Sequence, residues 1–155
     1  PLVSDNQEVI SSTAIRHLIA AGEVAKAQHM LGRAYTLSGT VVLGNQRGNT
    51  IGFPTANLAL EATKIAVPSI GVYAVNVFID GKCYKGMANI GKNPTFGDVE
   101  EARLEVNIFD FNGNLYGKEI TVAFIERIRG EVKFASVDAL VEQIKKDKET
   151  CLNLL

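Results

Sequence analysis

The sequence predicts a mainly β protein, a small antiparallel barrel or sandwich of five or six strands with a helix at its C-terminal end. Three features lead to this fold class. From Tyr35 onward, apolar and polar residues alternate in several runs, as is typical of half-buried strands. The dipeptides Asp80-Gly81 and Asn112-Gly113 each follow such a run and favour tight hairpin turns. Near the C-terminus, the apolar residues change to helical spacing.

Helical patterns lie at both ends of the chain. Residues 12–21 have a Ser or Thr as a possible cap, apolar residues at helical spacing and Gly22 as a stop, and residues 23–31 repeat the pattern up to Gly32. We therefore expect two short helices joined by a tight turn. Ser136 is a suitable N-cap for the last helix. A solvated face of that helix is expected to hold Lys145, Lys146, Asp147, Lys148 and Glu149.

Five runs are expected to be strands, at residues 36–43, 71–79, 82–90, 103–111 and 119–128. The second and third should pair through one of the two hairpin dipeptides, and the fourth and fifth through the other. A barrel of this size has a filled interior, so a ligand should bind at a rim. The connections 44–70 and 91–102 are longer than hairpins need, which is often a sign of functional loops.

Composition limits the function classes. The 155 residues are 46% hydrophobic and 21% charged, as in ordinary soluble domains. The net charge of −1 argues against a broad nucleic-acid interface, and no apolar run approaches the roughly 20 residues of a membrane span. We expect neither nucleic acid nor membrane as a partner, and a cytoplasmic location. Cys83 and Cys151 match no metal or redox motif and are expected to be reduced thiols.

The most unusual stretch combines Gly44, Gly48 and Gly52 with Arg47. Glycine lets backbone N–H groups approach an anion closely, and arginine offers a planar fork that suits phosphate. The stretch matches neither a P-loop, which needs a Lys-Ser or Lys-Thr pair, nor the dinucleotide fingerprint, since Pro54 argues against a helix there. This stretch is therefore either a phosphate-binding loop or a long glycine-rich hairpin connection.

Thr55 and Asn57 lie two positions apart at the end of this stretch. On an extended segment, this spacing puts both side chains on one face. Their neutral oxygens are ligands that a hard cation such as Mg²⁺ accepts.

Glu105 is a charged residue inside an apolar strand pattern. By alternation it shares a face with Asn107 and Phe109, while Leu104 and Val106 take the opposite face. One reading is an outward-facing surface glutamate, because charged residues are mostly exposed. The other is a general base near a site at the rim.

Two further segments carry aromatic residues among turn-forming residues. The loop around Asn93 is either a lid over a flat ligand or a wide turn. The segment from Arg129 to Phe134 separates the last strand from the final helix. Phe134 either staples the helix entry or helps to cover an aromatic ligand.

Several of these motifs, in this order, resemble the riboflavin kinase family. The resemblance rests on residues 44–57, 90–95, 105–117 and 127–134, and it covers about residues 35–152. One departure is Gln46, where the family pattern suggests another glycine, and this change is expected to alter the mobility of the loop. Residues 10–16 and the helices after them resemble the tail of the nucleotidyltransferase domain that precedes the kinase module in bacterial bifunctional FAD synthetase.

The resemblance implies two parts, a helical tail of a preceding domain at 1–34 and a riboflavin kinase barrel at 35–155. The chain starts at Pro1 rather than Met and lacks the transferase's nucleotide-binding motif, so we expect a piece of a longer protein without the FAD-forming reaction. The expected partner is the N-terminal adenylyltransferase domain of the full-length protein. The implied fold is a six-stranded antiparallel Greek-key barrel with a C-terminal helix, preceded by two short helices.

The implied reaction is riboflavin + ATP → FMN + ADP, assisted by Mg²⁺. By resemblance, Glu105 is the catalytic base, and Thr55 and Asn57 bind the metal. The expected ATP-binding residues are Gly44, Arg47, Gly48, Gly52, Pro54, Thr55, Asn57 and Asn93. The expected riboflavin-binding residues are Asn93, Glu105, Arg129 and Phe134. The alternatives are a barrel that carries flavin without phosphorylating it, and a small interaction module.

Overall fold

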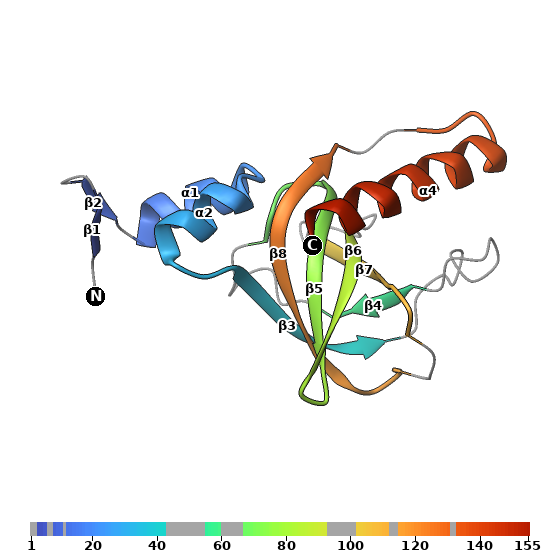
Figure 1. The fold of residues 1–155 in the computed structure, drawn as a ribbon, viewed down its shortest axis with the longest axis horizontal. Coiled ribbons are helices and arrows are strands. Elements are labelled where there is room, and N and C mark those ends of the chain that lie inside the picture. Colours follow the sequence, from blue (N-terminus) through green and yellow to red (C-terminus); the bar gives the residue numbers. More distant parts are fainter. Residues whose placement is uncertain are drawn as a thin grey trace, which may run out of the picture.

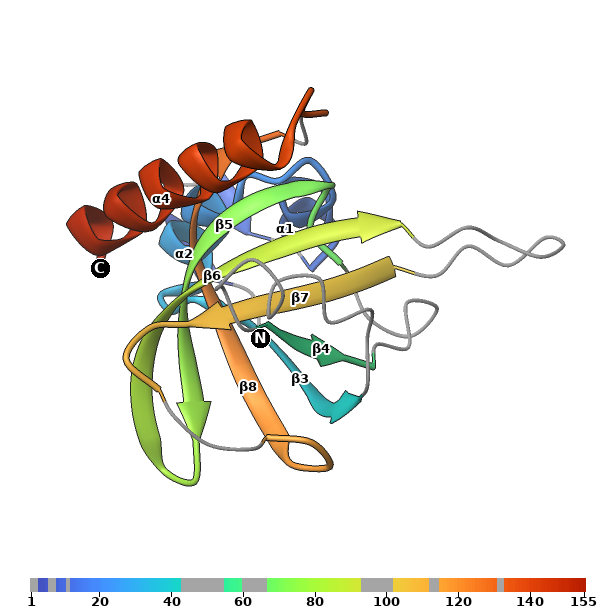
Figure 2. The same ribbon diagram turned by 90° about the vertical axis from the view of Figure 1, so that its right-hand side faces the viewer.

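The computed structural model describes residues 3–5, 8–10, 12–42, 55–59, 67–92, 102–111, 115–130 and 133–155. Its centre is a closed barrel of six antiparallel strands, which confirms the predicted fold class (Figures 1 and 2). The strands are β3 (Tyr35–Val42), β4 (Ala56–Leu58), β5 (Gly71–Ile79), β6 (Lys82–Lys92), β7 (Ala102–Ile108) and β8 (Glu119–Arg129). They follow the order β3-β4-β7-β6-β5-β8 around the barrel. Strands β5, β6 and β7 are sequential neighbours and β8 returns beside β5, as in a Greek key.

The hairpin between β5 and β6 is confirmed, with the turn at the predicted dipeptide and β6 two residues longer than predicted. Its turn places Asp80 at φ 50° and Gly81 at φ 81°, the left-handed pair that a type I′ turn needs. The second predicted hairpin is wrong. Strand β7 ends at Ile108 and pairs with β6 and β4, whereas β8 pairs with β5 and β3. This pairing closes the barrel, which removes the open edges that a simple meander leaves. The dipeptide at 112–113 lies outside the described residues.

Three strands were not predicted. Strand β4 lies inside the long connection 44–70, and its three residues are too few to show a period. Strands β1 (Val3–Asp5) and β2 (Glu8–Ile10) form a separate two-stranded hairpin near the N-terminus (Figure 1).

The barrel interior is filled by apolar side chains, as predicted. They come from alternate positions of the strands, and Tyr73 packs edge-on against Phe124 with ring centroids 5.4 Å apart. The fully buried members include Val75, Val77, Ile90, Leu104, Val106, Ile120 and Val122. A ligand must therefore bind outside this interior.

The predicted helices are present. Helices α1 (Ser12–Ala20) and α2 (Val24–Leu31) are joined at Gly22, whose φ of 83° suits glycine, and Val24 of α2 belongs to the core cluster of the barrel. Helix α4 (Val137–Leu154) begins after Ser136, whose hydroxyl accepts a hydrogen bond from the Ala139 N–H at 3.1 Å. It lies across the outside of β5 and β6 (Figure 2). Within the described part of the chain, no helix combines the length and apolar character of a membrane span.

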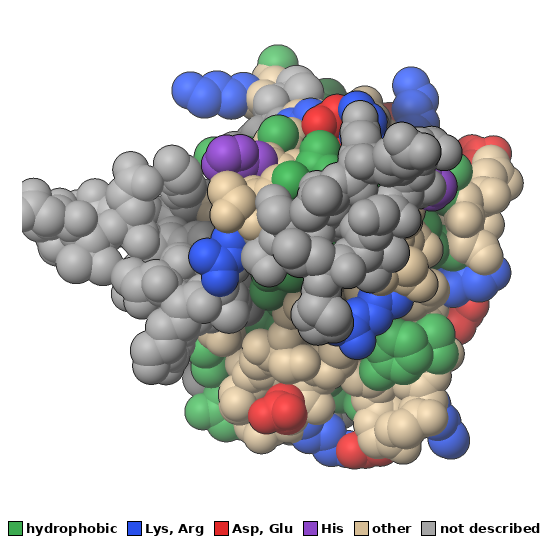
Figure 3. Space-filling view, turned by 90° about the vertical axis from the view of Figure 1, so that its left-hand side faces the viewer, with side chains coloured by type: hydrophobic (Ala, Val, Ile, Leu, Met, Phe, Trp, Pro, Cys, Tyr) green, Lys and Arg blue, Asp and Glu red, His purple; other side chains and the backbone are tan. Residues whose placement is uncertain are grey.

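Figure 3 shows the charged side chains on one face of the described structure. On the face drawn in Figure 3, the described Lys and Arg side chains are scattered among polar and acidic ones and form no continuous basic patch.

The two cysteines lie in different environments. Cys83 is exposed, and Cys151 is fully buried under α4 against Ala74 and Phe109; both are free thiols, as predicted. Burial, with a smaller contribution from the charge of Asp147, raises the pKa of Cys151 from 9.0 to about 12.

We predict that a thiol-reactive disulfide reagent at pH 8 titrates one thiol rapidly, because only Cys83 is accessible and Cys151 stays protonated. The second thiol should react only as fast as the fold opens, or at once in denaturant. A Cys83→Ser variant should lose the rapid phase. Two rapid equivalents in the native parent protein would contradict the burial of Cys151.

Candidate active site on the outer wall of the barrel

The sheet register brings two of the predicted site residues together. Asn57 of β4 lies directly opposite Glu105 of β7, and Glu105 lies opposite Asn89 of β6. Directly opposed residues have Cβ atoms about 4.5–5.5 Å apart and point to the same face. Leu104 and Val106, the neighbours of Glu105, are fully buried in the barrel interior, so this row of three polar residues is on the outer wall.

The row continues across two more strands. Asn89 is opposite Val72 of β5, and Val72 is opposite Arg129 at the end of β8. The outer-wall row, defined as Asn57, Glu105, Asn89, Val72 and Arg129, therefore crosses five neighbouring strands. At about 4.8 Å per strand, its ends are about 19 Å apart along the sheet. The register thus places predicted metal, base and flavin residues in one row, in which Val72 is buried.

The Asn57 end has the oxygen donors expected for a hard cation. Asn57 is only 8% exposed, and Thr55 is partly buried just before β4. The two side chains offer one hydroxyl and one amide oxygen, and the carboxylate of Glu105 faces Asn57 from β7. This set fits Mg²⁺, which prefers oxygen and usually keeps several waters. The described residues contain no group of three His, Cys, Asp or Glu side chains that could hold a metal.

Glu105 faces outward but is held in place. Its side chain is 18% exposed, and the Arg103 Nε lies 3.4 Å from its Oε1. The guanidinium of Arg103 lies over Gly91 on β6, where a Cβ would come within 2.8 Å of Nη2. Glycine at this position therefore makes room for the arginine beside the carboxylate. Because 3.4 Å is long for a hydrogen bond, the carboxylate retains capacity to accept a proton donor.

Arg129 and Phe134 lie together at the other end of the row. The Arg129 guanidinium carbon is 5.8 Å from the centre of the Phe134 ring, within cation–π range. The same guanidinium is bound by Asp147 of α4, with Nη2 to Oδ2 at 2.8 Å. Arg129 is thus strongly engaged within the protein as well as near the predicted flavin surface.

Asp147 was predicted to lie on the solvated face of the last helix, and this prediction is wrong, because the residue is only 2% exposed. This residue lies at helical spacing from Leu140, Ile144 and Cys151, on the stripe that turns toward the barrel. That spacing could have identified it from the sequence, but the surrounding lysines obscured the pattern.

Other predicted site residues lie outside the described part of the chain. They are Gly44, Arg47, Gly48, Gly52, Pro54 and Asn93.

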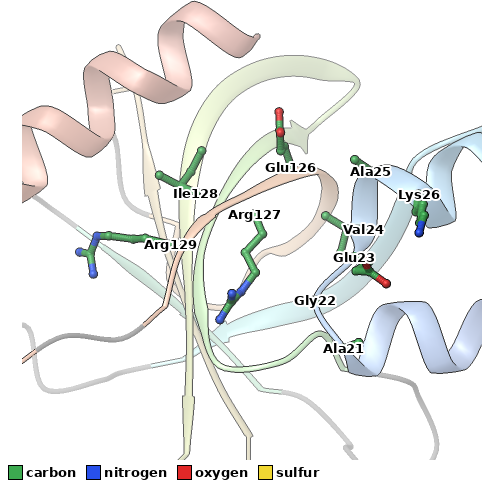
Figure 4. Close-up of a pocket in the computed structure, with 10 residues that line it drawn as sticks. All are labelled: Ala21, Gly22, Glu23, Val24, Ala25, Lys26, Glu126, Arg127, Ile128 and Arg129. Atoms are coloured by element: carbon green, nitrogen blue, oxygen red, sulfur yellow. The ribbon is translucent and has the colours of Figure 1, made fainter.

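A hollow lies between the α1–α2 turn and β8 (Figure 4). Its lining includes Glu23, Lys26, Arg127 and also Arg129, the last residue of the outer-wall row. Arg127 donates a hydrogen bond to the Ile70 carbonyl at 2.8 Å, which ties β8 to the start of β5. Strand β8 is three places from β7 around the barrel, so this hollow is distinct from the Asn57–Glu105 pair.

Comparisons with known proteins point to one family. The family model for riboflavin kinase matches residues 31–155. The chain is 43% identical over 152 residues to the bifunctional riboflavin kinase/FMN adenylyltransferase of Bacillus subtilis, and 44% identical over 156 residues to that of Haemophilus influenzae. These matches cover 97% and 96% of the chain but 48% and 50% of the relatives. The chain therefore spans about half the length of the curated relatives it matches.

Two solved structures are similar. A Streptococcus pneumoniae protein, titled a macrolide-efflux protein, has a TM-score of 0.89 and 50% identity, with 99% of this chain and 50% of that chain covered. A riboflavin kinase from Trypanosoma brucei has a TM-score of 0.54 and 25% identity, with 77% and 78% covered. The first title names a different activity, but the family model and the curated relatives agree with each other. The chain belongs to the riboflavin kinase family.

Proposed function

We propose that this chain transfers the terminal phosphoryl group of ATP to the terminal ribityl hydroxyl of riboflavin, giving FMN and ADP. The observation that carries the proposal is the register of β4 and β7, which places Asn57 opposite Glu105 on the outer wall. This arrangement sets a neutral oxygen ligand beside a carboxylate on rigid strands, and phosphoryl transfer depends mainly on positioning and charge neutralisation. Family membership supplies the substrate class.

In this proposal, Glu105 is the general base. Its carboxylate accepts the proton of the ribityl hydroxyl as the oxygen bonds to the γ-phosphorus and the bond to the ADP oxygen breaks. Arg103 keeps the carboxylate oriented from one side. The open side of Glu105 is then directed to the substrate.

Thr55 and Asn57 would hold Mg²⁺ together with the ATP phosphates. When bound, Mg²⁺ supplies charge neutralisation for the phosphate oxygens. Because both side chains are neutral, they leave the positive charge of the ion for the nucleotide. The glycines at 44, 48 and 52, with Arg47, Pro54 and Asn93, are proposed to contact ATP.

The flavin ring is proposed to lie toward the Arg129 end of the outer-wall row. Phe134 offers an aromatic face there, and Asn93 is proposed to border the ring from its loop. Separating the ring from the phosphates by several strands suits an elongated substrate, whose ribityl hydroxyl then meets ATP near Glu105.

We further propose that the FMN adenylyltransferase activity in the relatives' names belongs to the part of those proteins that this chain does not match. The expected product of this chain is FMN rather than FAD, and an adenylyltransferase domain is the expected partner in the whole protein. The division at residues 34 and 35 and the cytoplasmic location stay predictions.

A turnover assay tests the function directly. The purified chain is mixed with riboflavin and ATP, with and without Mg²⁺, and the flavins are separated by chromatography. FMN formed only with the metal supports the kinase. Flavin binding without FMN formation would instead favour a flavin carrier.

We predict that Glu105→Gln lowers kcat on the order of 10²-fold or more, because the general base is lost while the fold and substrate binding are kept. Glu119→Gln, an exposed glutamate on β8, is the matched control and should behave like the parent. Turnover of Glu105→Gln within about threefold of the parent would rule out this role.

We predict that Asn57→Ala raises the Kd for MgATP more than the Kd for riboflavin, because it removes a metal ligand at the phosphate end of the row. Titration of each ligand separately measures the two constants. Asn76→Ala, on the outer side of β5, controls for loss of an asparagine from the wall. An equal loss for both ligands would point to collapse of the site instead.

A further inference from the structure

Asp147 is a buried carboxylate on a helix whose neighbouring charges are in solvent. It is 2% exposed, whereas Lys145 and Lys146 are exposed. An unpaired carboxylate at this depth would be costly, so its partners decide whether the helix can pack here. Arg129 Nε lies 3.1 Å and 3.0 Å from the two carboxylate oxygens, and Nη2 lies 2.8 Å from Oδ2. Gln143 adds an amide donor at 3.0 Å.

The guanidinium of Arg129 joins three segments of the chain. One edge binds Asp147 on α4, and Nη1 donates to the Gly130 carbonyl at 3.0 Å, just after the end of β8. Its flat face lies over Phe134, just before α4. Figure 4 shows that Arg129 points away from the α1–α2 turn. Three of its N–H groups are therefore committed to other parts of the protein, which limits what it can offer to a ligand.

The ion pair between Arg129 and Asp147 connects the end of β8 to α4. Strand β8 ends at Arg129, and α4 lies against the outside of the barrel (Figure 1), where its Asp147 pairs with Arg129. Phe134 lies in the segment between β8 and α4. Arg129 is also in the outer-wall row, at a fixed strand register from Asn89 and Glu105. The ion pair between Arg129 and Asp147 therefore helps to fix where the Phe134 ring lies relative to these two residues.

We propose that Asp147 is a positioning residue for riboflavin: it holds Arg129, and through Arg129 it holds the Phe134 ring against which the flavin binds. The inference rests on the proposed function. It assigns to α4 a role in substrate affinity in addition to packing. A purely structural ion pair would change stability and leave the affinity for riboflavin unaltered.

The test compares Asp147→Asn with Cys151→Ala, a matched change one turn later on the same buried stripe. Cys151 packs against Ala74 and Phe109 in a buried apolar cluster. We expect Asp147→Asn to raise the KM and Kd for riboflavin about 10-fold, with the KM for MgATP and kcat within about threefold, since misplacement of a binding group by about 1 Å carries penalties of this order or more. Cys151→Ala should lower the melting temperature and leave the riboflavin constants unchanged. Equal riboflavin constants in the two variants would overturn the proposal.

A double-mutant cycle tests the route through the ring. In a Phe134→Ala background, Asp147→Asn should change the Kd for riboflavin less than about twofold, because both changes act at the same contact. If the two effects multiply, Asp147 acts elsewhere and the proposal fails. Should Asp147→Asn unfold at the assay temperature, Arg129→Lys replaces it, since lysine keeps the charge but lacks the fork and the plane. Parent-like riboflavin binding by folded Arg129→Lys would also overturn the proposal.

Riboflavin binding, measured by flavin fluorescence, distinguishes failure of the proposed kinase function from failure of the proposed role of Asp147. A parent chain that makes no FMN refutes the proposed kinase, whereas its binding constants still test the role of Asp147. A parent that makes FMN, with riboflavin binding unchanged in Asp147→Asn, refutes only the positioning role.

Discussion

Closure of the barrel is the constraint on which the rest of the structure depends. Strand β8 pairs with β3 on one side and β5 on the other, so no strand of the barrel has an open edge. A six-stranded barrel of this size encloses only side chains, and here they are apolar. Every polar group that takes part in chemistry must then lie on the outer wall or in the loops. The outer-wall row is the direct result of this exclusion.

The wall also explains how residues from distant parts of the sequence act together. The three-residue strand β4 fits between β3 and β7, and this placement alone brings Asn57 opposite Glu105. Side chains on paired strands keep their spacing because the ladder hydrogen bonds fix the backbone. Held in this way, the proposed base and the proposed metal ligand are better suited to phosphoryl transfer than the same residues on two loops.

Helix α4 completes the barrel wall from outside. Cys151 packs with Ala74 and Phe109, which covers the outer side of the sheet beside the row. One turn earlier, Asp147 binds Arg129. A buried ion pair is a weak source of stability, because desolvation offsets most of the attraction. Its effect here is geometrical: it ties the helix to the end of β8 and to the aromatic ring that precedes the helix.

The sequence by itself determined the features that depend on near neighbours. The turn at Asp80-Gly81, the cap at Ser136 and the outward face of Glu105 follow from left-handed turn residues, a helix cap and a period of two, all of which are local. The tertiary structure alone decided the partners of β7 and β8, the inclusion of β4 and the burial of Asp147. Strand partners depend on which pairing closes the barrel, and a strand of three residues shows no period. The surroundings of Asp147 come from β8, a strand that approaches α4 only when the chain folds back on itself.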